Sequence, residues 1–368
     1  MIVDLPLSSD DSELLALMVD FAARRVRPDA ARADAEQALG STMLTDLDEL
    51  GLLTDIAEEH GGQGAPSAGL RLVLLEALAA ADSGLALEAA AHAAALSLVQ
   101  AVAPGETARR LVEPLLASGA RATLAYHEGH GRSPLELETT AARRPDAWVL
   151  SGAKRTVVRP AKAELTVVVA ARAGEPAAFA LTGHPDRWRV TRDDQEVGKL
   201  GLRSAITGEV AFDELAAEVL GTGLELHRWV AWYRLAVGAI AVGVGAAALD
   251  YAVRYAKQRA AFGRQIIDYQ GVEFPLVEAD MALDAARLEI QDTWSTVAGE
   301  ASPEAIAARV ARAVALATSA GLDSARTGVN TLGGHGYLAD HPQERHYRDA
   351  TTLAAIDFDP LVNAGVGY

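Results

Sequence analysis

The sequence predicts an α+β fold, mainly α, in which a central antiparallel β domain separates an N-terminal helical domain from a C-terminal helical bundle. Residues 1–120 are rich in Ala, Leu, Glu and Arg at helical spacing. Residues 121–222 contain short β-branched and aromatic runs between Gly, Pro and Asp clusters, which is typical of antiparallel strands. The Ala-rich helical pattern returns over residues 223–368. We therefore expect three domains with these bounds, the sheet lying between two helical domains.

The helical segments have recognisable starts and stops. Residues 8–11 (SSDD) form a cluster of N-cap residues before the first helix. Residues 61–64 (GGQG) and 104–105 (PG) divide the first domain into helices and turns. In the last domain the helical pattern breaks at residues 262–263 (FG) and 302–303 (SP), so we expect separate helices on either side of each break.

Three short runs in the middle of the chain predict strands. They cover residues 147–150 (AWVL), 165–169 (LTVVV) and 178–181 (AFAL). Each run is rich in β-branched or aromatic residues and is bounded by turn-forming residues. They predict a small antiparallel sheet.

Composition excludes several classes of protein. The chain has no cysteine, which rules out thiolate catalysis, Cys-ligated zinc and iron–sulfur clusters. Its net charge of −17 would repel a polyanion, so we expect no nucleic-acid partner. The N-terminal residues lack the basic and apolar regions of a signal peptide, and we find no run of about 20 uncharged apolar residues. We expect a cytoplasmic protein without a membrane partner.

Four ordered blocks of sequence resemble the acyl-CoA dehydrogenase family. They run through nearly the whole chain at the spacing of the family. The blocks are Pro28 and Asp34 with residues 47–52 (LDELGL) and 60–64 (HGGQG); residues 201–204 (GLRS) and 210–213 (VAFD); residues 255–263 (YAKQRAAFG) with Gln270; and residues 332–337 (LGGHGY) with Pro342, Glu344, Arg345 and residues 347–349 (YRD).

The resemblance implies a function and a cofactor. Members of this family oxidise acyl-CoA thioesters at the α and β carbons with FAD, and an electron-transfer flavoprotein accepts the electrons. The resemblance also implies a C-terminal four-helix bundle and an oligomer in which FAD crosses a subunit boundary. The β domain of one subunit holds the isoalloxazine ring, and helices of its neighbour hold the ADP half.

The residues that would serve the ADP half are present. By resemblance they are Arg259, Phe262, Gly263, Gln270, Asn330, Gly333 and Gly334. A guanidinium suits a pyrophosphate because its donors are fixed, bidentate and permanently charged. The glycines allow the backbone to approach a dinucleotide closely. Taken alone, a surface arginine and an ordinary helix-ending turn would explain the same residues.

The residues that would cradle the flavin depart from the family pattern. Where the family reads Thr-Glu-Pro-Gly-x-Gly-Ser-Asp, residues 126–133 read YHEGHGRS. Where the family reads Trp-Ile-Thr-Asn, residues 156–159 read TVVR. The aromatic wall and the threonine near the flavin N5 atom are both missing. His127 and His130 have no third ligand nearby, so we expect loop histidines and no metal site.

The catalytic base also departs from the pattern. Alignment from residues 348–350 (RDA) places Asp357 where the family has the glutamate that removes the α-proton, and Phe358 where glycine is usual. Some members carry the base on the first long C-terminal helix, where this chain has Tyr233, a poor base at neutral pH. The adjacent Arg234 is a candidate substrate-binding residue.

Three hypotheses remain open. The first is a divergent partner subunit of a heterotetrameric acyl-CoA dehydrogenase, which supplies the ADP-half contacts to an FAD whose flavin lies on the other subunit. The second is a self-sufficient homotetramer with Asp357 as base. The third is a structural or binding homologue without FAD. We also expect an oligomer that assembles through the C-terminal helices. Gly238, Gly243 and Gly245 would let helices of two subunits pack closely, unless these glycines pack within the chain's own core.

Overall fold

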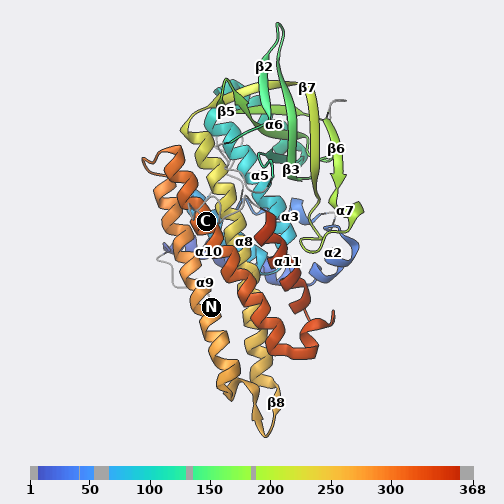
Figure 1. The fold of residues 1–368 in the computed structure, drawn as a ribbon, viewed down its shortest axis with the longest axis vertical. Coiled ribbons are helices and arrows are strands. Elements are labelled where there is room, and N and C mark those ends of the chain that lie inside the picture. The colour runs from blue at the N-terminus through green and yellow to red at the C-terminus, as the bar shows by residue number, and fades with distance from the viewer. Residues whose placement is uncertain (1–6, 41, 54–65, 130–135, 184–187, 357–368) are drawn as a thin grey trace.

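The order of helices and strands confirms the predicted fold class. The computed structural model describes residues 7–40, 42–53, 66–129, 136–183 and 188–356. Figure 1 shows a helical N-terminal part, a sheet at one end of the molecule, and long C-terminal helices that extend away from the sheet. The positions of the domain boundaries stay a prediction. The predicted turn at 61–64 lies outside the described residues.

Two apolar helices form the centre of the N-terminal part. α4 and α5 are buried along most of their length, so they have no clear polar face. The predicted N-cap of α1 is confirmed, since the Ser8 hydroxyl accepts a hydrogen bond from the Asp11 amide. The elements are α1 (Ser9–Phe21), the π-helical turn η1 (Ala22–Val26), α2 (Ala30–Glu36), α3 (Met43–Glu49), α4 (Ala68–Ala79), α5 (Ser83–Val102) and α6 (Gly105–Ser118).

The central sheet has seven strands in the described part of the chain. Its order is β1-β4-β2-β3-β7-β5, with β6 beside β7, and a further β4–β5 pairing closes a ring of five strands. The predicted antiparallel sheet needs correction at two pairs, because β4 lies parallel to β1 and to β2. The strands are β1 (Ala122–Ala125), β2 (Thr140–Arg143), β3 (Trp148–Val158), β4 (Leu165–Arg172), β5 (Glu175–Thr182), β6 (Trp188–Asp193) and β7 (Thr207–Thr222); a short helix, α7 (Asp194–Val197), follows β6.

The sheet has its own apolar core, separate from that of the helices. Trp188 stacks on Phe212 with their ring centroids 5.5 Å apart, and Phe179 meets Trp148 edge to face. The three runs predicted as strands lie in β3, β4 and β5.

The C-terminal part is a four-helix bundle. Both predicted breaks are confirmed: α8 ends before a small hairpin, and Ser302 caps α10. The elements are α8 (Leu224–Gln258), β8 (Ala260–Ala261), β9 (Arg264–Gln265), η3 (Ile266–Asp268), α9 (Gln270–Val297), α10 (Pro303–Leu332), η4 (Gly333–Tyr337) and α11 (Gln343–Ile356). In Figure 1 the β8–β9 hairpin protrudes at the end of the molecule far from the sheet.

The small residues of α8 pack within the chain rather than against another subunit. A Cβ at Gly243 would lie 2.3 Å from the Glu76 carbonyl oxygen, and a Cβ at Gly245 would lie 2.8 Å from the Gly321 Cα. Gly238 faces Ala317 at 3.3 Å in the same way. These glycines therefore let α8 approach α4 and α10 closely, and they give no support to assembly through this face.

Three helices are long and apolar enough to cross a membrane by length and composition: α5, α8, and the stretch formed by α10 and η4. Glu88 interrupts the first of these and Asp250 the second, so neither contains an uncharged apolar run of about 20 residues. The share of the most apolar 18 residues that is buried inside the protein is 83% in α5, 72% in α8 and 50% in the third stretch. The apolar composition of α5 and α8 therefore serves the core of this fold.

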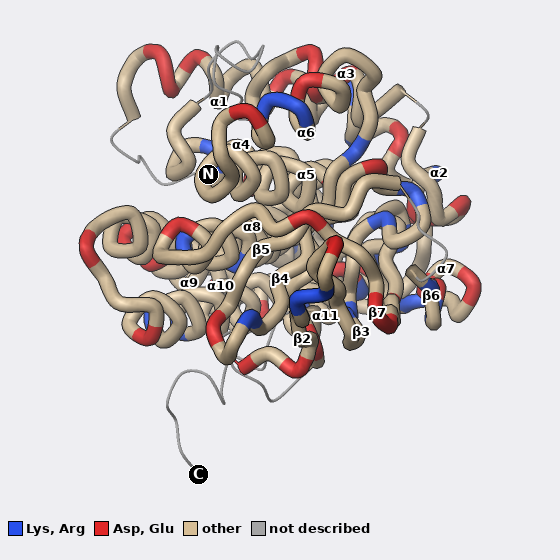
Figure 2. Tube along the Cα trace, turned by 90° about the horizontal axis from the view of Figure 1, so that it is seen from above, with Lys and Arg blue, Asp and Glu red and all other residues tan. Residues whose placement is uncertain are grey.

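Charged residues of both signs are distributed over the outer surface. In Figure 2 blue and red segments are interspersed along the helices and loops. This arrangement agrees with the excess of 50 Asp and Glu over 33 Lys and Arg.

Candidate cofactor site

Four of the predicted cofactor residues line one open hollow. Arg259 follows the last residue of α8, and Asn330, Gly333 and Gly334 lie at the end of α10. Arg259 is exposed, and its side chain makes no hydrogen bond or ion pair with any described residue. The remaining lining residues are Tyr255, Ile266, Thr331, Leu332, His335 and Leu338.

The glycines make the floor of this hollow accessible. Gly333 has a left-handed φ of 58°, and its amide donates to the Asn330 carbonyl oxygen to end α10. A Cβ at Gly333 or Gly334 would meet no atom within 4 Å, so both positions face open space. Tyr255 and His335 close one side, joined by a 3.0 Å hydrogen bond between the Tyr255 hydroxyl and His335 Nδ1.

Of the other three predicted residues, Phe262 and Gly263 lie at the turn of the protruding hairpin, and Gln270 begins the helix that follows it. Phe262 is 98% exposed with a left-handed φ of 53°, and Gly263 follows with a φ of 88°. Tyr269 supports the loop by donating its hydroxyl to the Ala261 carbonyl oxygen at 2.9 Å. Gln270 is exposed at the first position of α9. A fully exposed phenylalanine in a strained conformation is typical of a residue that has a binding role.

This hollow fits the ADP half of a dinucleotide. It offers the uncompensated guanidinium of Arg259 for a pyrophosphate, the amide of Asn330, and backbone that a ligand can approach closely. His335 was missed from the sequence because its place beside Tyr255, 80 residues earlier, depends on how α8 and α10 pack.

The flavin half of the site does not fit. Tyr126, at a family threonine position, is buried and meets Tyr233 edge to face with ring centroids 5.7 Å apart. Arg159, at a family asparagine position, donates to Glu88 at 2.8 Å, and the Glu88 side chain is almost fully buried. Bulky and charged side chains thus occupy the positions where the family has small hydrogen-bonding ones.

A buried ion pair fixes the loop that carries Tyr126. Lys154 Nζ lies 2.6 Å from Glu128 Oε1 and also donates to the Tyr126 carbonyl oxygen at 3.2 Å. Burial lowers the pKa of Lys154 to about 8, although the carboxylate of Glu128 partly offsets this effect. Glu128 also accepts hydrogen bonds from the amides of Glu138 and Thr139. The loop therefore holds Tyr126 firmly, and sequence inspection alone did not pair Lys154 with Glu128.

The strand beside this loop is irregular at the same place. Thr156 and Arg159 both have left-handed φ values, near 52° and 51°, and the β3–β7 register shifts between Lys154 and Val157. Such backbone is costly for a β-branched residue. The segment 156–159 therefore differs from an ordinary flat strand as well as from the family sequence.

Of the two remaining candidate residues, only Arg234 is described, and it does not line the hollow. Arg234 is buried in α8 and lines a small cavity with Tyr126, His227, Val230 and residues at the start of α10. Asp357 lies outside the described residues, so its role as a base stays a prediction. Within the described ranges no group of three or more His, Asp or Glu side chains could hold a metal ion.

The chain has two helical domains around a central sheet and a hollow formed by the ends of α8 and α10. These features are those of the class of FAD-dependent acyl-CoA dehydrogenases. The N-terminal domain model of acyl-CoA dehydrogenases matches residues 8–119, and the C-terminal domain model matches residues 221–357. Together they cover more than half of the chain, which belongs to the acyl-CoA dehydrogenase family. This is a family of oxidoreductases that act on acyl-CoA with FAD as cofactor.

Similar proteins agree with this assignment. The chain is 28% identical over 344 residues to the mitochondrial short-chain specific acyl-CoA dehydrogenase of Mus musculus, covering 90% of this chain and 82% of the relative. It is also 28% identical over 360 residues to the probable acyl-CoA dehydrogenase FadE25 of Mycobacterium tuberculosis, covering 94% and 90%.

Solved structures share the fold. Butyryl-CoA dehydrogenase from Megasphaera elsdenii superposes with a TM-score of 0.85 at 22% identity, and the match covers 99% of both chains. PigA with FAD and proline gives a TM-score of 0.87 at 19% identity, covering 99% of this chain and 98% of that chain.

Proposed function

We propose that this chain is the divergent partner subunit of a heteromeric acyl-CoA dehydrogenase. In this proposal it supplies the ADP-half contacts to an FAD whose flavin lies on the other subunit. One contrast supports the proposal. Arg259 and the glycines of the hollow are open to a ligand, whereas Tyr126 and Arg159 fill the flavin positions of the same chain.

The proposed reaction of the assembled enzyme is α,β-dehydrogenation of an acyl-CoA. Bound FAD supplies the acceptor for the hydride, and an electron-transfer flavoprotein takes the electrons onward. The part of this chain is binding: Arg259 neutralises the pyrophosphate, and Asn330 and the Gly333 backbone orient it. Phe262, exposed on its hairpin, would become buried against the partner subunit or the cofactor. We place this enzyme in the cytoplasm.

A flavin spectrum tests the proposal. The chain should show no absorbance band near 450 nm when purified alone, and the band should appear when it is purified with the dehydrogenase subunit that binds it. In that complex Arg259→Ala should reduce flavin retention by about tenfold or more, because a charged contact to a pyrophosphate contributes roughly 1.5–3 kcal/mol. Arg109→Ala, an exposed arginine on α6, is the matched control and should leave flavin content unchanged.

Three results would overturn the proposal. One flavin per chain in the isolated protein would instead support a self-sufficient homotetramer. Unchanged flavin content in the Arg259→Ala complex would show that the hollow does not hold the cofactor. A complex without any flavin would favour a structural homologue.

A further inference from the structure

A second hollow lies next to the first, one turn earlier on α8, and has no role in the proposed cofactor contacts. It has a volume of about 560 Å³, equal to that of the hollow at Arg259, and the two share no lining residue. Its walls come from four parts of the chain: Arg27, Ala31, Asp34 and Ala35 near α2; Ala80 and Ala81 before α5; Ala247, Asp250, Tyr251 and Arg254 on α8; and Ala339, Asp340, His341, Pro342, Glu344, Arg345 and His346 around the start of α11.

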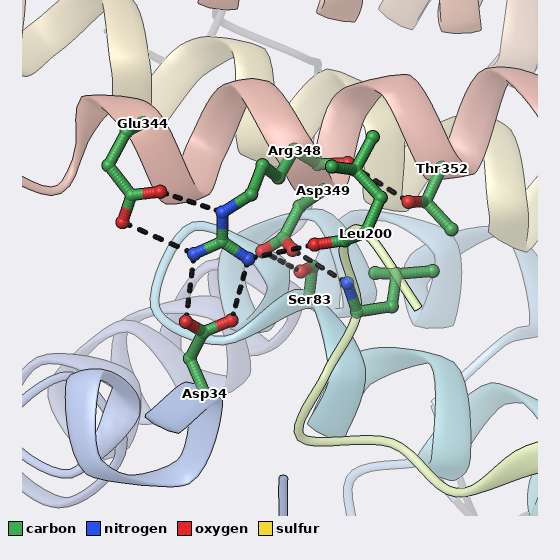
Figure 3. Close-up of polar contacts among 8 residues, drawn as sticks. Asp34, Ser83, Leu200, Glu344, Arg348, Asp349 and Thr352 are labelled. Atoms are coloured by element: carbon green, nitrogen blue, oxygen red, sulfur yellow. Dashed lines mark hydrogen bonds and ion pairs between the residues drawn. The ribbon is translucent and has the colours of Figure 1, made fainter. Parts of the chain in front are cut away.

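Most of the acidic side chains in these walls are already neutralised. Arg348 binds Asp34 through two hydrogen bonds of 3.0 and 2.8 Å and binds Glu344 through two of 2.7 and 3.2 Å. Figure 3 shows its guanidinium held between the two carboxylates. Asp250 pairs with Arg254 at 2.9 Å on the exposed face of α8. Of the four acids that line the hollow, Asp340 alone has no such ion pair with a described residue.

Two arginines of the same walls have no partner. Neither Arg27 nor Arg345 makes a hydrogen bond or an ion pair with any described residue through its side chain. Both act on His346, which also lines the hollow. Burial lowers the pKa of His346 to about 3, and the positive charges of Arg345 and Arg27 lower it further in the same direction. Arg27 and Arg345 therefore both line the hollow near His346, and the charge of Arg345 also acts on the carboxylate of Asp82.

The rest of the lining has the shape and chemistry of a nucleotide pocket. Six alanines contribute small side chains to the walls, which leaves width for a flat ring. Tyr251 and His341 present aromatic rings and are joined by a 2.8 Å hydrogen bond between the Tyr251 hydroxyl and His341 Nδ1. Small apolar walls with a few converging polar groups are the usual composition of a small-molecule site.

We propose that this hollow binds a phosphorylated ligand of nucleotide size, with its phosphates between Arg27 and Arg345 and its base near Tyr251 and His341. Guanidinium groups are the preferred partners of phosphate because they donate two parallel hydrogen bonds. The whole chain has a net charge of −17, which would repel an anion. Within this hollow, however, three of the four carboxylates are already paired with arginines, so two further guanidinium groups can hold an anion. The proposal does not depend on the partner-subunit role, because the two hollows share no lining residue, although His341 contacts Tyr255 and His335 at the wall between them.

Calorimetric titration of the purified chain tests the site. The ligands are ADP, pyrophosphate, inorganic phosphate and adenosine, each at 50 and 300 mM NaCl. We expect ADP to bind more tightly than either phosphate alone or adenosine alone, and to bind more weakly at high salt. Tight binding of pyrophosphate with no gain for ADP would assign the site to free phosphates and overturn the nucleotide assignment.

Variants locate the ligand. Arg27→Gln with Arg345→Gln should weaken ADP binding at least tenfold, and Arg189→Gln, an exposed arginine without a described partner on β6, should not change it. If the double variant unfolds, Arg27→Gln alone should still weaken binding, because that exposed side chain makes no contact that the fold needs. Arg259→Ala should leave this binding intact. Loss of binding in Arg259→Ala, with retention in the double variant, would place the ligand in the cofactor hollow and overturn the proposal.

Discussion

At the scale of single residues, the buried histidine His92 shows how this fold depends on pH. His92 lies on α5, and its Nδ1 accepts a hydrogen bond of 2.9 Å from the Ala122 amide at the start of β1. Burial lowers its pKa to about 3, and the nearby charge of Arg121 acts in the same direction. The neutral ring thus joins the N-terminal helices to the first strand.

The protein should lose stability below pH 6.5 partly through His92. In the unfolded chain this histidine binds a proton near pH 6.5, whereas in the folded chain it resists protonation down to about pH 3. Its contribution is therefore complete above pH 6.5 and falls by about 1.4 kcal/mol for each pH unit below it. Urea unfolding at pH 7.5, 6.5 and 5.5 should show a steeper loss for the wild type than for His92→Asn, whose side-chain oxygen can replace Nδ1. Parallel profiles would contradict this.

At the scale of elements, α11 is tied to both other parts of the chain through two adjacent residues. Arg348 binds Asp34 of α2 and the Leu200 carbonyl oxygen, and Asp349 accepts hydrogen bonds of 2.7 Å from the Ser83 hydroxyl and the Leu202 amide (Figure 3). The side chains of Arg348 and Asp34 are only 17% and 15% exposed, so solvent screens their pairing weakly.

Removing the charge of Asp34 should loosen this connection. We expect Asp34→Asn to destabilise the protein by about 1–3 kcal/mol, because it weakens a charge-assisted pair that is mostly shielded from water. Asp20→Asn is the matched control: its partner Arg24 is 81% exposed, so the change should be within about 0.5 kcal/mol. The free energies come from denaturant unfolding at pH 7.5. Equal effects in the two variants would show that the connection through Arg348 carries no stability.

These contacts also explain which parts of the structure could be predicted from sequence. The helix starts at Ser8 and Ser302 could be predicted, because each serine accepts a hydrogen bond from an amide only three residues later. Asp34 and Arg348 are 314 residues apart, and nothing in either segment specifies the other. The same holds for the cofactor site. The family motifs predicted that Arg259 and Gly333 serve one site. They did not predict the pairing of Lys154 with Glu128, because that contact depends on how the loop folds onto β3.

At the scale of the whole molecule, α9 has an apolar surface that the chain itself leaves uncovered. Phe274, Val277, Met281 and Leu288 are between 51% and 67% exposed. Their spacing of three, four and seven residues places them on one face of the helix. Figure 1 shows α9 along the outer edge of the bundle, so this face is accessible. We propose that it packs against another subunit, in place of the glycines of α8, which the chain's own core covers.

A charge on this surface should weaken the oligomer. Met281→Glu would place a carboxylate at the centre of the stripe, where burial against a neighbour would cost several kcal/mol. Light scattering at micromolar concentration should therefore show a smaller species for Met281→Glu than for the wild type. Val197→Glu, an exposed apolar residue on α7, should leave the mass unchanged. A wild-type chain that is monomeric both alone and with its partner would rule out assembly altogether.

The Lys154–Glu128 pair has a consequence for the evolutionary history of the chain. Replacing either residue alone leaves a buried charge without its partner, which costs about 3–5 kcal/mol. An ancestor with a proline at position 128 could acquire the pair only together with the surrounding loop, and a descendant could lose it only by a simultaneous double change. Return to a flavin-binding loop would have to pass through a poorly folded intermediate. Once the pair is present, single substitutions at positions 128 and 154 are therefore disfavoured, and the two residues change together or not at all.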